Sequence, residues 1–509
     1  MVVGEVNMDT DVVVIGGGPG GYTAAIRAAE LGLSVALVER DERPGGVCLH
    51  QGCMPSKALA AAADLAYRAR TAETMGLRVA GLEIDMAALH AWQQGIVDRL
   101  ARGVSTLLEK HGVTVVRGLA ALAGPTQVSV AASHGNERYT ARRGIVVATG
   151  AALIPAAPLH SDGTRVLRAV DALRLDRLPA TVAVVGGDYI AVEIAVALRK
   201  LGSAVTLLGA SHHLLPEVDA SLAPLALRGL QRLGISWQSD AHPLELTDEG
   251  LRIRRGVDAG SGSDTEIIAA EVVVVSGTER RPHVDELGLD LLRMRQHDAG
   301  FILVDERQQS SVAGIYAVGD VTPGAAWAHR AYRQGKVAAE VIAGRPAAFD
   351  AVAVPAVVLA EPHLASVGLG EQEAEAAGYD PVVARFPWAA SGRALTLGAG
   401  SGQGSGQGSG QSSGQSSGQG SGQSSGQGSG QSSGQTLVVA DRASGVLLGA
   451  HIAGPDAGEL IGEAALALEM GATLDDIALT IHPHPTLSEG LAEACELALG
   501  LPTHTLPAR

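Results

Sequence analysis

Residues 11–39 read D-V-V-V-I-G-G-G-P-G-G-Y-T-A-A-I-R-A-A-E-L-G-L-S-V-A-L-V-E, and this stretch decides the fold. A short apolar strand leads into a glycine-rich turn, and a helical run and a second apolar strand follow. The turn has the spacing G-x-G-x-x-G, formed by Gly16, Gly18 and Gly21. Such glycines let the backbone approach a pyrophosphate at the helix N-terminus, and Glu39 can accept a hydrogen bond from a ribose hydroxyl. The stretch predicts the start of an α/β dinucleotide-binding domain; a plain glycine-rich turn is the weaker alternative.

The next stretch, G-G-V-C-L-H-Q-G-C-M-P-S-K over 45–57, contains Cys48 and Cys53, two of the three cysteines in the chain. Their spacing is about one helical turn, which can bring two sulfurs within disulfide range. The alanine-rich run that follows favours a helix, so we expect the pair near a helix N-terminus, where the dipole favours a thiolate.

Three interpretations of this cysteine pair compete. A structural disulfide is disfavoured because no signal peptide precedes it and Cys495 has no partner cysteine. A metal site requires more ligands than His50 alone adds. A redox-active dithiol agrees best with the sequence.

Composition limits the classes of function. The chain has 509 residues, enough for about three or four domains. Hydrophobic residues make up 46% of it, yet no apolar run is long enough to span a bilayer. A net charge of −16 disfavours nucleic acid and anionic membranes as partners. The first ten residues lack the basic and apolar blocks of a targeting segment, so we expect a cytoplasmic protein.

Together, the glycine turn and the cysteine pair resemble the start of the pyridine nucleotide–disulfide oxidoreductases, in which G-G-x-C-x-x-x-x-G-C-x-P-S-K follows the FAD ribose acid. The resemblance implies an α/β protein with two Rossmann-like domains, for FAD and NAD, and a C-terminal α+β dimerisation domain. The expected bounds are 9–150 for the first FAD segment, 151–282 for the NAD(P) domain, 283–347 for the second FAD segment and 348–509 for the dimerisation domain.

The resemblance also implies roles for individual residues. Cys53 would lie against the flavin, and Cys48 would be the outer thiol that meets substrate. Lys57 would lie near the reactive edge of the flavin and pair with Glu193. Further cofactor contacts are expected at the ends of later strands and at the start of the following helix: Thr149, Gly150, Gly319, Asp320 and Ala328.

A second βαβ pattern begins at 181 and contains Gly186 and Gly187 in its turn; its last apolar strand closes at Gly277. It resembles the nicotinamide nucleotide domain of the family, with departures. Asp188 replaces the second glycine, where its charge beside a diphosphate would cost roughly 3 kcal/mol of binding free energy. Gly209 stands where an NAD enzyme carries its ribose acid. We expect NAD because no arginine follows Gly209; a flavoprotein with an impaired nicotinamide site, acting as a binding or assembly subunit, is the alternative.

Residues 398–435 consist almost entirely of serine, glycine and glutamine. The segment has no charge and almost no hydrophobic side chain, so it cannot form a core. We expect a flexible loop that interrupts the last domain; a tether that binds a partner is the weaker alternative.

The last motif, I-H-P-H-P-T-L-S-E over 481–489, resembles the ending of the dihydrolipoamide dehydrogenases within the family. The match implies that His484 is the base for an incoming thiol and that Glu489 orients it, both reached from the opposite subunit of a homodimer. It further implies FAD-dependent oxidation of dihydrolipoamide with NAD as acceptor. The substrate would be carried on the lipoylated domain of a 2-oxo acid dehydrogenase complex. A glutathione or mercuric reductase is the nearest alternative, although the chain lacks the terminal cysteine pair of the latter.

Overall fold

The structure is a computed structural model that describes residues 6–133, 135–154, 159–256, 265–277, 279–398 and 434–506. The chain forms two compact units, one of Met1–Leu215 with Ile235–Ala351 and the other of Pro216–Gly234 with Val352–Arg509. The predicted α/β class is confirmed. The Ser-Gly-Gln segment predicted as a loop lies outside the described residues except at its ends. Within the described residues, no helix is both long and apolar enough to cross a membrane.

The first sheet of unit 1 is built around β1. Parallel pairings give the order β3-β2-β1-β5-β16, and β4 joins β3 and β5 by antiparallel pairing. Its central strands carry valine and isoleucine on both faces, as expected of strands covered on both sides. The strands are β1 (Val6–Ile15), β2 (Val35–Glu39), β3 (Thr114–Gly124), β4 (Gln127–Ala132), β5 (Gly135–Val147) and β16 (Ile315–Ala317).

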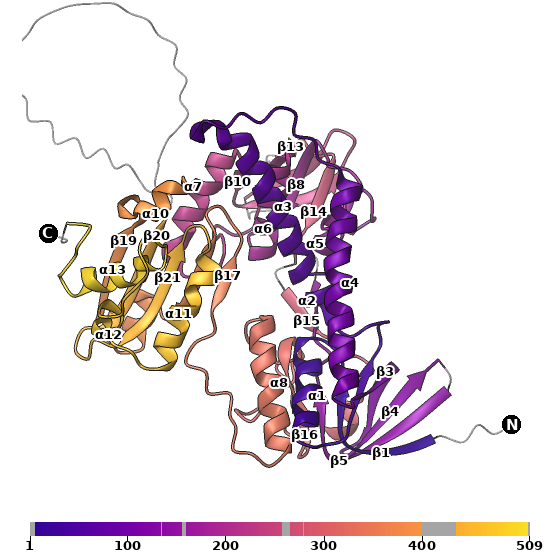
Figure 1. Cartoon of the computed structure of the whole chain (residues 1–509). Helices are drawn as coiled ribbons and strands as arrows, with labels where there is room; N and C mark the ends of the chain where they lie inside the picture. The colour runs from indigo at the N-terminus through magenta and orange to yellow at the C-terminus, as the bar shows by residue number, and fades with distance from the viewer. Residues whose placement is uncertain are drawn as a thin grey trace, which may run out of the picture. The chain divides into compact units, whose positions relative to one another are not determined.

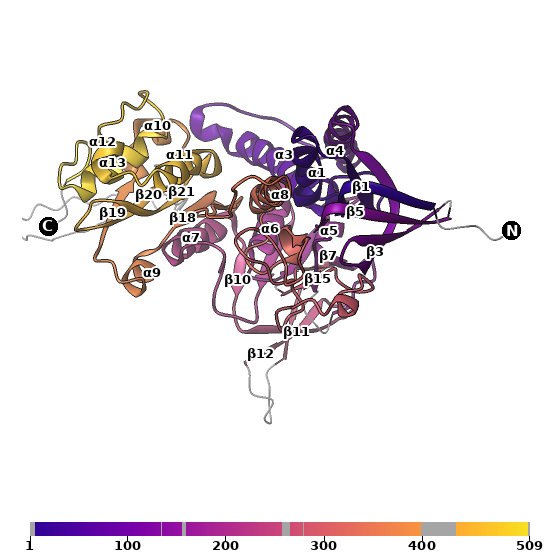
Figure 2. The ribbon, with the colours of Figure 1, turned by 90° about the horizontal axis from the view of Figure 1, so that it is seen from below.

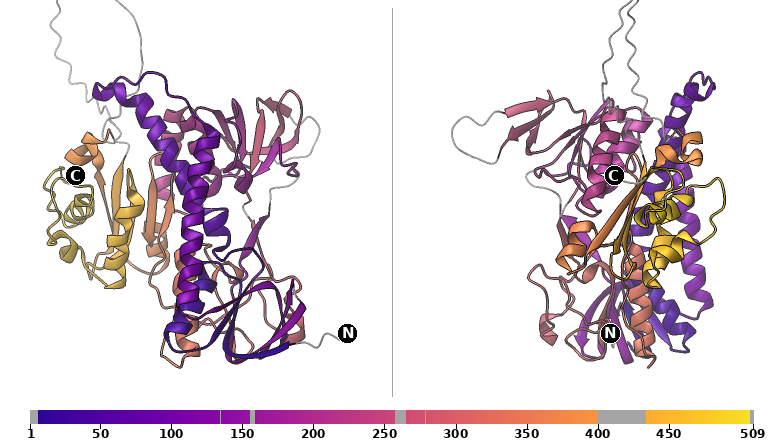
Figure 3. Two further views of the ribbon diagram at one scale, coloured as in Figure 1. Left: turned by 45° about the vertical axis from the view of Figure 1, so that its right-hand side comes forward. Right: turned by 90° about the vertical axis from the view of Figure 1, so that its left-hand side faces the viewer.

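Helices from distant parts of the chain cover this sheet. α1 (Pro19–Glu30) and α8 (Ala328–Ile342) lie side by side (Figures 1 and 2), and Arg27 binds Glu340 across them at 2.7 Å. The two long helices α3 (Cys53–Thr71) and α4 (Met86–Lys110), indigo to violet in Figure 3, pack together. The segment after β16, which contains α8, thus packs on α1 of the first dinucleotide unit.

The second sheet of unit 1 is wholly parallel, in the order β10-β9-β8-β14-β7. α6 (Tyr189–Leu201) follows β8 and packs on α3. An antiparallel sheet β11-β12-β13 and the pair β6–β15 complete the unit. The parallel strands are β7 (Val166–Arg168), β8 (Thr181–Val185), β9 (Ala204–Leu208), β10 (Ser236–Gln238) and β14 (Val272–Val275). The others are β6 (Ala151–Ile154), β11 (Ala241–Leu246), β12 (Leu251–Arg255), β13 (Thr265–Ile268) and β15 (Glu279–Pro282).

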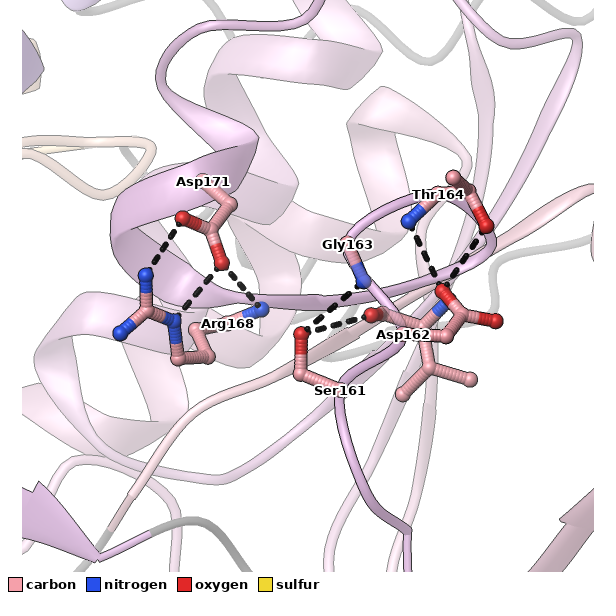
Figure 4. A network of polar contacts seen from close by, with 7 residues as sticks. Ser161, Asp162, Gly163, Thr164, Arg168 and Asp171 are labelled. Atoms are coloured by element: carbon pink, nitrogen blue, oxygen red, sulfur yellow. Dashed lines mark hydrogen bonds and ion pairs between the residues drawn. The ribbon is translucent and has the colours of Figure 1, made fainter.

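A polar turn sets the start of the edge strand β7. Asp162 accepts hydrogen bonds from the backbone N–H groups of Arg165 and Val166 and, as Figure 4 shows, of Thr164, all at 2.8–2.9 Å. Burial raises the pKa of this carboxyl, but the backbone donors outweigh burial and lower the pKa to about 2. The turn therefore holds an ionised carboxylate at any ordinary pH and has a structural role.

Unit 2 contains an antiparallel sheet in the order β17-β18-β21-β20-β19, with α11 and α13 packed on it. Trp388 and Phe386 are among its largest buried side chains, and the Trp388 indole donates a hydrogen bond to Thr436 at 3.0 Å. The strands are β17 (Ala356–Val358), β18 (Leu364–Gly368), β19 (Pro381–Pro387), β20 (Gln435–Asp441) and β21 (Leu447–Ala453). The helices are α9 (Glu371–Ala376), α10 (Gly392–Thr396), α11 (Ala457–Glu469), α12 (Leu474–Ala478) and α13 (Glu489–Ala498).

One segment lies outside the domain that its position in the sequence suggests. Residues 216–234, which include α7 (Ala223–Leu233), fall inside the expected NAD(P) domain but form part of unit 2. Gly229 explains this: a Cβ at that residue would lie 1.3 Å from the carbonyl oxygen of Glu361. Only a glycine allows α7 to approach the unit 2 backbone so closely, and one glycine in a helical pattern does not reveal such a contact.

Candidate active site

Both cysteines of the predicted dithiol lie on helices that meet at a turn. Cys48 is in the short α2 (Gly46–His50), and Cys53 is the first residue of α3. Both carry free thiols and are partly exposed. Gly46 has a positive φ of 61°, and a Cβ there would lie 2.7 Å from the Cα of Gly18. The dithiol segment therefore passes directly against the glycine turn of the first dinucleotide unit.

The two thiols differ in acidity. A hydrogen bond from Cys48 lowers the pKa of Cys53, burial opposes this, and the charge of Lys57 supports it. The same hydrogen bond, together with burial, raises the pKa of Cys48. Cys53 also begins a 19-residue helix, whose dipole stabilises negative charge at that end. When both sulfurs are reduced, Cys53 is therefore the more acidic of the two thiols.

The expected ion pair beside the dithiol is present. Lys57 Nζ lies 2.9 Å from Glu193 Oε1, and the pair joins α3 to α6. The Glu193 side chain is only 8% exposed, whereas that of Lys57 is 41% exposed. The buried carboxylate thus holds the lysine one helical turn from Cys53.

The three predicted glycines of the first unit meet at the ends of β1 and α1. Gly16 has a φ of 99°, and a Cβ on Gly21 would lie 1.8 Å from the carbonyl oxygen of Gly16. Glu39 Oε2 accepts the Gly17 N–H at 2.7 Å, which fixes the carboxylate at the edge of the turn. Gly18 precedes α1, and no side chain caps this helix. The first turn of α1 is therefore open to an external anion.

Other predicted residues fit a large polar cofactor such as FAD. The buried Thr149 hydroxyl has no hydrogen-bond partner among the described residues, which leaves it for a ligand. Gly150 and Gly319 have positive φ angles of 73° and 75°. Burial raises the pKa of Asp320, although Arg280, 3.4 Å away, and Arg330 lower it. Ala328 is the first residue of α8.

The second dinucleotide unit is only partly suited to its predicted ligand. Gly186 has a φ of 144°, as the sharp turn requires, and Gly187 follows it. Gly277 lets the chain after β14 approach β6, because a Cβ there would lie 2.4 Å from the Ile154 carbonyl oxygen. However, Asp188 caps α6 with its own carboxylate, so the first turn of this helix is not open.

The C-terminal histidine and its predicted orienting carboxylate lie together in unit 2. His484 Nδ1 lies 2.8 Å from Glu489 Oε1, and Glu489 Oε2 accepts the Thr486 N–H at 2.7 Å. Burial raises the pKa of Glu489, but the hydrogen bonds from Thr486 and His484 together have the larger effect and lower it overall. The carboxylate is therefore ionised. The His484 side chain is 76% exposed, as an external thiol would require. His482 instead binds Glu463 at 2.7 Å.

The sequence did not single out several aromatic residues near these motifs. Tyr22 and Tyr332 join α1 to α8 through their hydroxyls at 3.0 Å. Burial raises the pKa of Tyr22, as do Tyr332 and the nearby cysteines. Tyr189 packs on Trp327 with ring centroids 4.9 Å apart. Aromatic residues make up only 3% of the chain, so their occurrence within the motifs is a signal that could have identified them.

Comparisons with known proteins agree with this geometry. The family described as "Pyridine nucleotide-disulphide oxidoreductase" matches residues 10–335, and its dimerisation domain matches residues 354–403 and 417–495. A dihydrolipoyl dehydrogenase of Halobacterium salinarum is 40% identical, over 99% of this chain and 100% of the relative. One of Geobacillus stearothermophilus is 38% identical, with the same coverage of each chain.

Solved structures share the fold. The crystal structure of LpdA from Mycobacterium tuberculosis has a TM-score of 0.82 at 24% identity and covers 96% of this chain and 99% of its own. The flavoprotein disulfide reductase RclA from Escherichia coli has a TM-score of 0.77 at 23% identity with the same coverage. The two family matches together span most of the chain, and the relatives match it from end to end. This protein therefore belongs to the pyridine nucleotide-disulphide oxidoreductase family.

Proposed function

We propose that this protein oxidises dihydrolipoyl groups through the Cys48–Cys53 dithiol, with FAD and NAD as cofactors. The observation that carries the proposal is the asymmetric thiol pair: Cys53 is made acidic by Cys48 and by the helix dipole, beside the Lys57–Glu193 ion pair. The end-to-end similarity to dihydrolipoyl dehydrogenases supports the choice of substrate.

The oxidised protein has a disulfide between Cys48 and Cys53. One thiol of the dihydrolipoyl group loses its proton and attacks the Cys48 sulfur, which forms a mixed disulfide and releases Cys53 as a thiolate. The second substrate thiol then attacks the first, which forms the cyclic disulfide and releases Cys48, and Cys48 takes a proton. The protein thereby gains the two electrons that the substrate loses. When bound, FAD supplies the two-electron acceptor for the reduced dithiol and NAD the final acceptor.

His484 of the partner subunit is the proposed base. Glu489 holds the Nδ1 side of the ring, which directs Nε2 to the incoming thiol. The ionised carboxylate also stabilises the imidazolium that forms when the proton is accepted. The match to the dimerisation domain supports a homodimer as the assembly that completes the site.

The proposal extends to domains, partner and location. We assign 9–150 and 283–347 to FAD, 348–509 to dimerisation, and 151–282 to the nicotinamide nucleotide except for residues 216–234, which form part of unit 2. The substrate is a lipoylated carrier domain of a 2-oxo acid dehydrogenase complex in the cytoplasm. Pull-down of the holoenzyme with a purified lipoylated domain tests the partner; an unlipoylated domain that binds equally well would contradict it.

The main test is Cys53→Ser in the holoenzyme. Loss of the sulfur should reduce lipoamide turnover by more than about 1000-fold, as removal of other catalytic nucleophiles does. FAD content should be unchanged because the cofactor cradle is formed elsewhere. Cys495→Ser is the matched control, since Cys495 is buried in unit 2 and takes no part in the reaction. Turnover retained in Cys53→Ser would end the assignment.

A second test separates the two histidine–glutamate pairs. His484→Gln should lower turnover by about 10²- to 10⁴-fold, the usual contribution of a general base. His482→Gln, which loses only its bond to Glu463, should keep most of the activity. Equal losses in both variants would show that the loop acts structurally and that His484 is not the base.

A further inference from the structure

The second dinucleotide unit carries an internal carboxyl group where a nucleotide diphosphate normally binds. Asp188 is the N-cap residue of α6, and its Oδ1 accepts the N–H groups of Ile190 at 2.9 Å and Ala191 at 3.0 Å. The Ser276 hydroxyl, at the end of β14, donates to the same oxygen at 2.9 Å. First-turn amides of this kind are the donors that hold a pyrophosphate in a Rossmann unit. Here the protein satisfies them itself.

The second oxygen of this carboxylate is buried and unpaired. Asp188 is 5% exposed, and its Oδ2 has no hydrogen-bond partner among the described residues. Burial raises the pKa of Asp188, although the two amides and Ser276 lower it. A buried carboxylate with one unsatisfied oxygen is destabilising.

An indole ring covers the neighbouring position for the ribose. Trp237 lies on β10 beside β9, and a Cβ built on Gly209 would lie 2.2 Å from its Cη2. A Cβ on Gly187 would lie 3.2 Å from the same carbon. No acidic side chain could stand at residue 209 without displacing Trp237. The Trp237 ring therefore occupies the position at which Rossmann domains that bind NAD place a carboxylate for the ribose.

We propose that Asp188 and Trp237 together fill part of the nicotinamide nucleotide site, so that this protein binds NAD weakly and Asp188 determines how weakly. The inference rests on the proposed function, because it concerns the acceptor site of that reaction. Two like charges about 5 Å apart, at an effective dielectric near 20, weaken binding by about 100-fold. Asp188 adds this penalty when it is ionised, and in either protonation state it occupies the amides of Ile190 and Ala191.

The test is calorimetric titration of the holoenzyme with NAD⁺. Asp188→Gly should tighten binding by about 100-fold, because the charge is removed and the amides are freed. Asp188→Asn keeps a capping oxygen without the charge and should tighten binding by at least about 10-fold, and it provides the measurement if the glycine variant does not fold. Asp85→Gly is the matched control: Asp85 is also an aspartate N-cap, accepting from Ala88 at 3.0 Å on α4. Its NAD⁺ affinity should equal that of the wild type.

Unchanged affinity in both Asp188 variants, or micromolar binding by the wild type, would overturn the inference. Its failure is distinguishable from failure of the proposed function. Anaerobic reduction of the holoenzyme by dihydrolipoamide needs no nucleotide and is measured on the same preparations. Reduction by dihydrolipoamide with tight NAD⁺ binding contradicts the inference alone, whereas absence of that reduction contradicts the proposed function.

Discussion

The two dinucleotide units of this chain share a strand–turn–helix–strand plan and differ at the residues that would touch a nucleotide. In the first, Gly18 leaves α1 uncapped and Glu39 stands at the end of β2. In the second, Asp188 caps α6 and Gly209 follows β9 beneath an indole ring. The backbone plan is thus preserved while the anion site is open in one unit and internally filled in the other. A Rossmann plan therefore does not by itself establish that a nucleotide binds.

The two dinucleotide units differ most at the third glycine position of the G-x-G-x-x-G motif. In the first unit, Gly21→Ala would place a methyl group 1.8 Å from the carbonyl oxygen of Gly16. We expect a loss of about 3 kcal/mol or more in the free energy of unfolding, with loss of bound FAD, because the backbone must move. Denaturant unfolding and FAD content after gel filtration measure both effects.

The corresponding residue of the second unit is already Ala191. Ala191→Gly should cost only about 1 kcal/mol, the usual helix penalty of glycine. If Gly21→Ala were as mild as this control, the close packing that distinguishes the first turn would not exist.

A charge swap tests whether the difference is electrostatic. Gly18 has an extended backbone, and the only atom within 4 Å of a Cβ there is Gly46 Cα at 3.9 Å, so Gly18→Asp has room. Copying the second unit into the first in this way should weaken FAD binding by about 100-fold. Fluorescence titration of the apoprotein with FAD measures the change.

Gly18→Asn is the neutral control, with nearly the same shape and no charge. It should bind FAD far better than Gly18→Asp. Equal losses in the two variants would show that bulk at this position, rather than charge, explains the contrast between the units.

The smallest expected effect concerns the Lys57–Glu193 ion pair, which joins α3 to α6. Lys57→Met should raise the pKa of Cys53, because the lysine charge stabilises the thiolate. Alkylation requires the thiolate, which predominates above the pKa, so the midpoint of the rate–pH profile of the reduced protein should move to higher pH. Lys200→Met is the control, since Lys200 pairs with Asp64 between the same two helices. An unmoved midpoint in Lys57→Met would remove the lysine from the thiol site.

Much of the first dinucleotide unit could be predicted from the local sequence pattern. The order of strand, glycine turn, helix and acid over 11–39 is visible in the sequence because each step depends on neighbouring residues. The position of Cys53 at a helix start follows from the same kind of pattern. The assignment of 216–234 to unit 2 could not be predicted, because it depends on the contact of Gly229 with a backbone far along the chain.

In the candidate site, too, local features could be predicted from the sequence, whereas contacts between distant residues could not. Asp188 and Gly209 were recognised as departures because each occupies a position with a known requirement. The hydrogen bond from Ser276 and the packing of Trp237 on Gly209 were not foreseen, because these residues come from β14 and β10, well outside the motif. The sequence thus indicated that something was missing from the second unit, and the structure shows what fills it.

The most direct test of the Cys48–Cys53 redox pair is anaerobic titration of the oxidised holoenzyme with dihydrolipoamide, followed by alkylation and peptide mapping. We expect the flavin spectrum to change and Cys48 and Cys53 to become alkylated in step with the dihydrolipoamide added. An unchanged flavin spectrum with both cysteines still protected from alkylation would contradict this expectation.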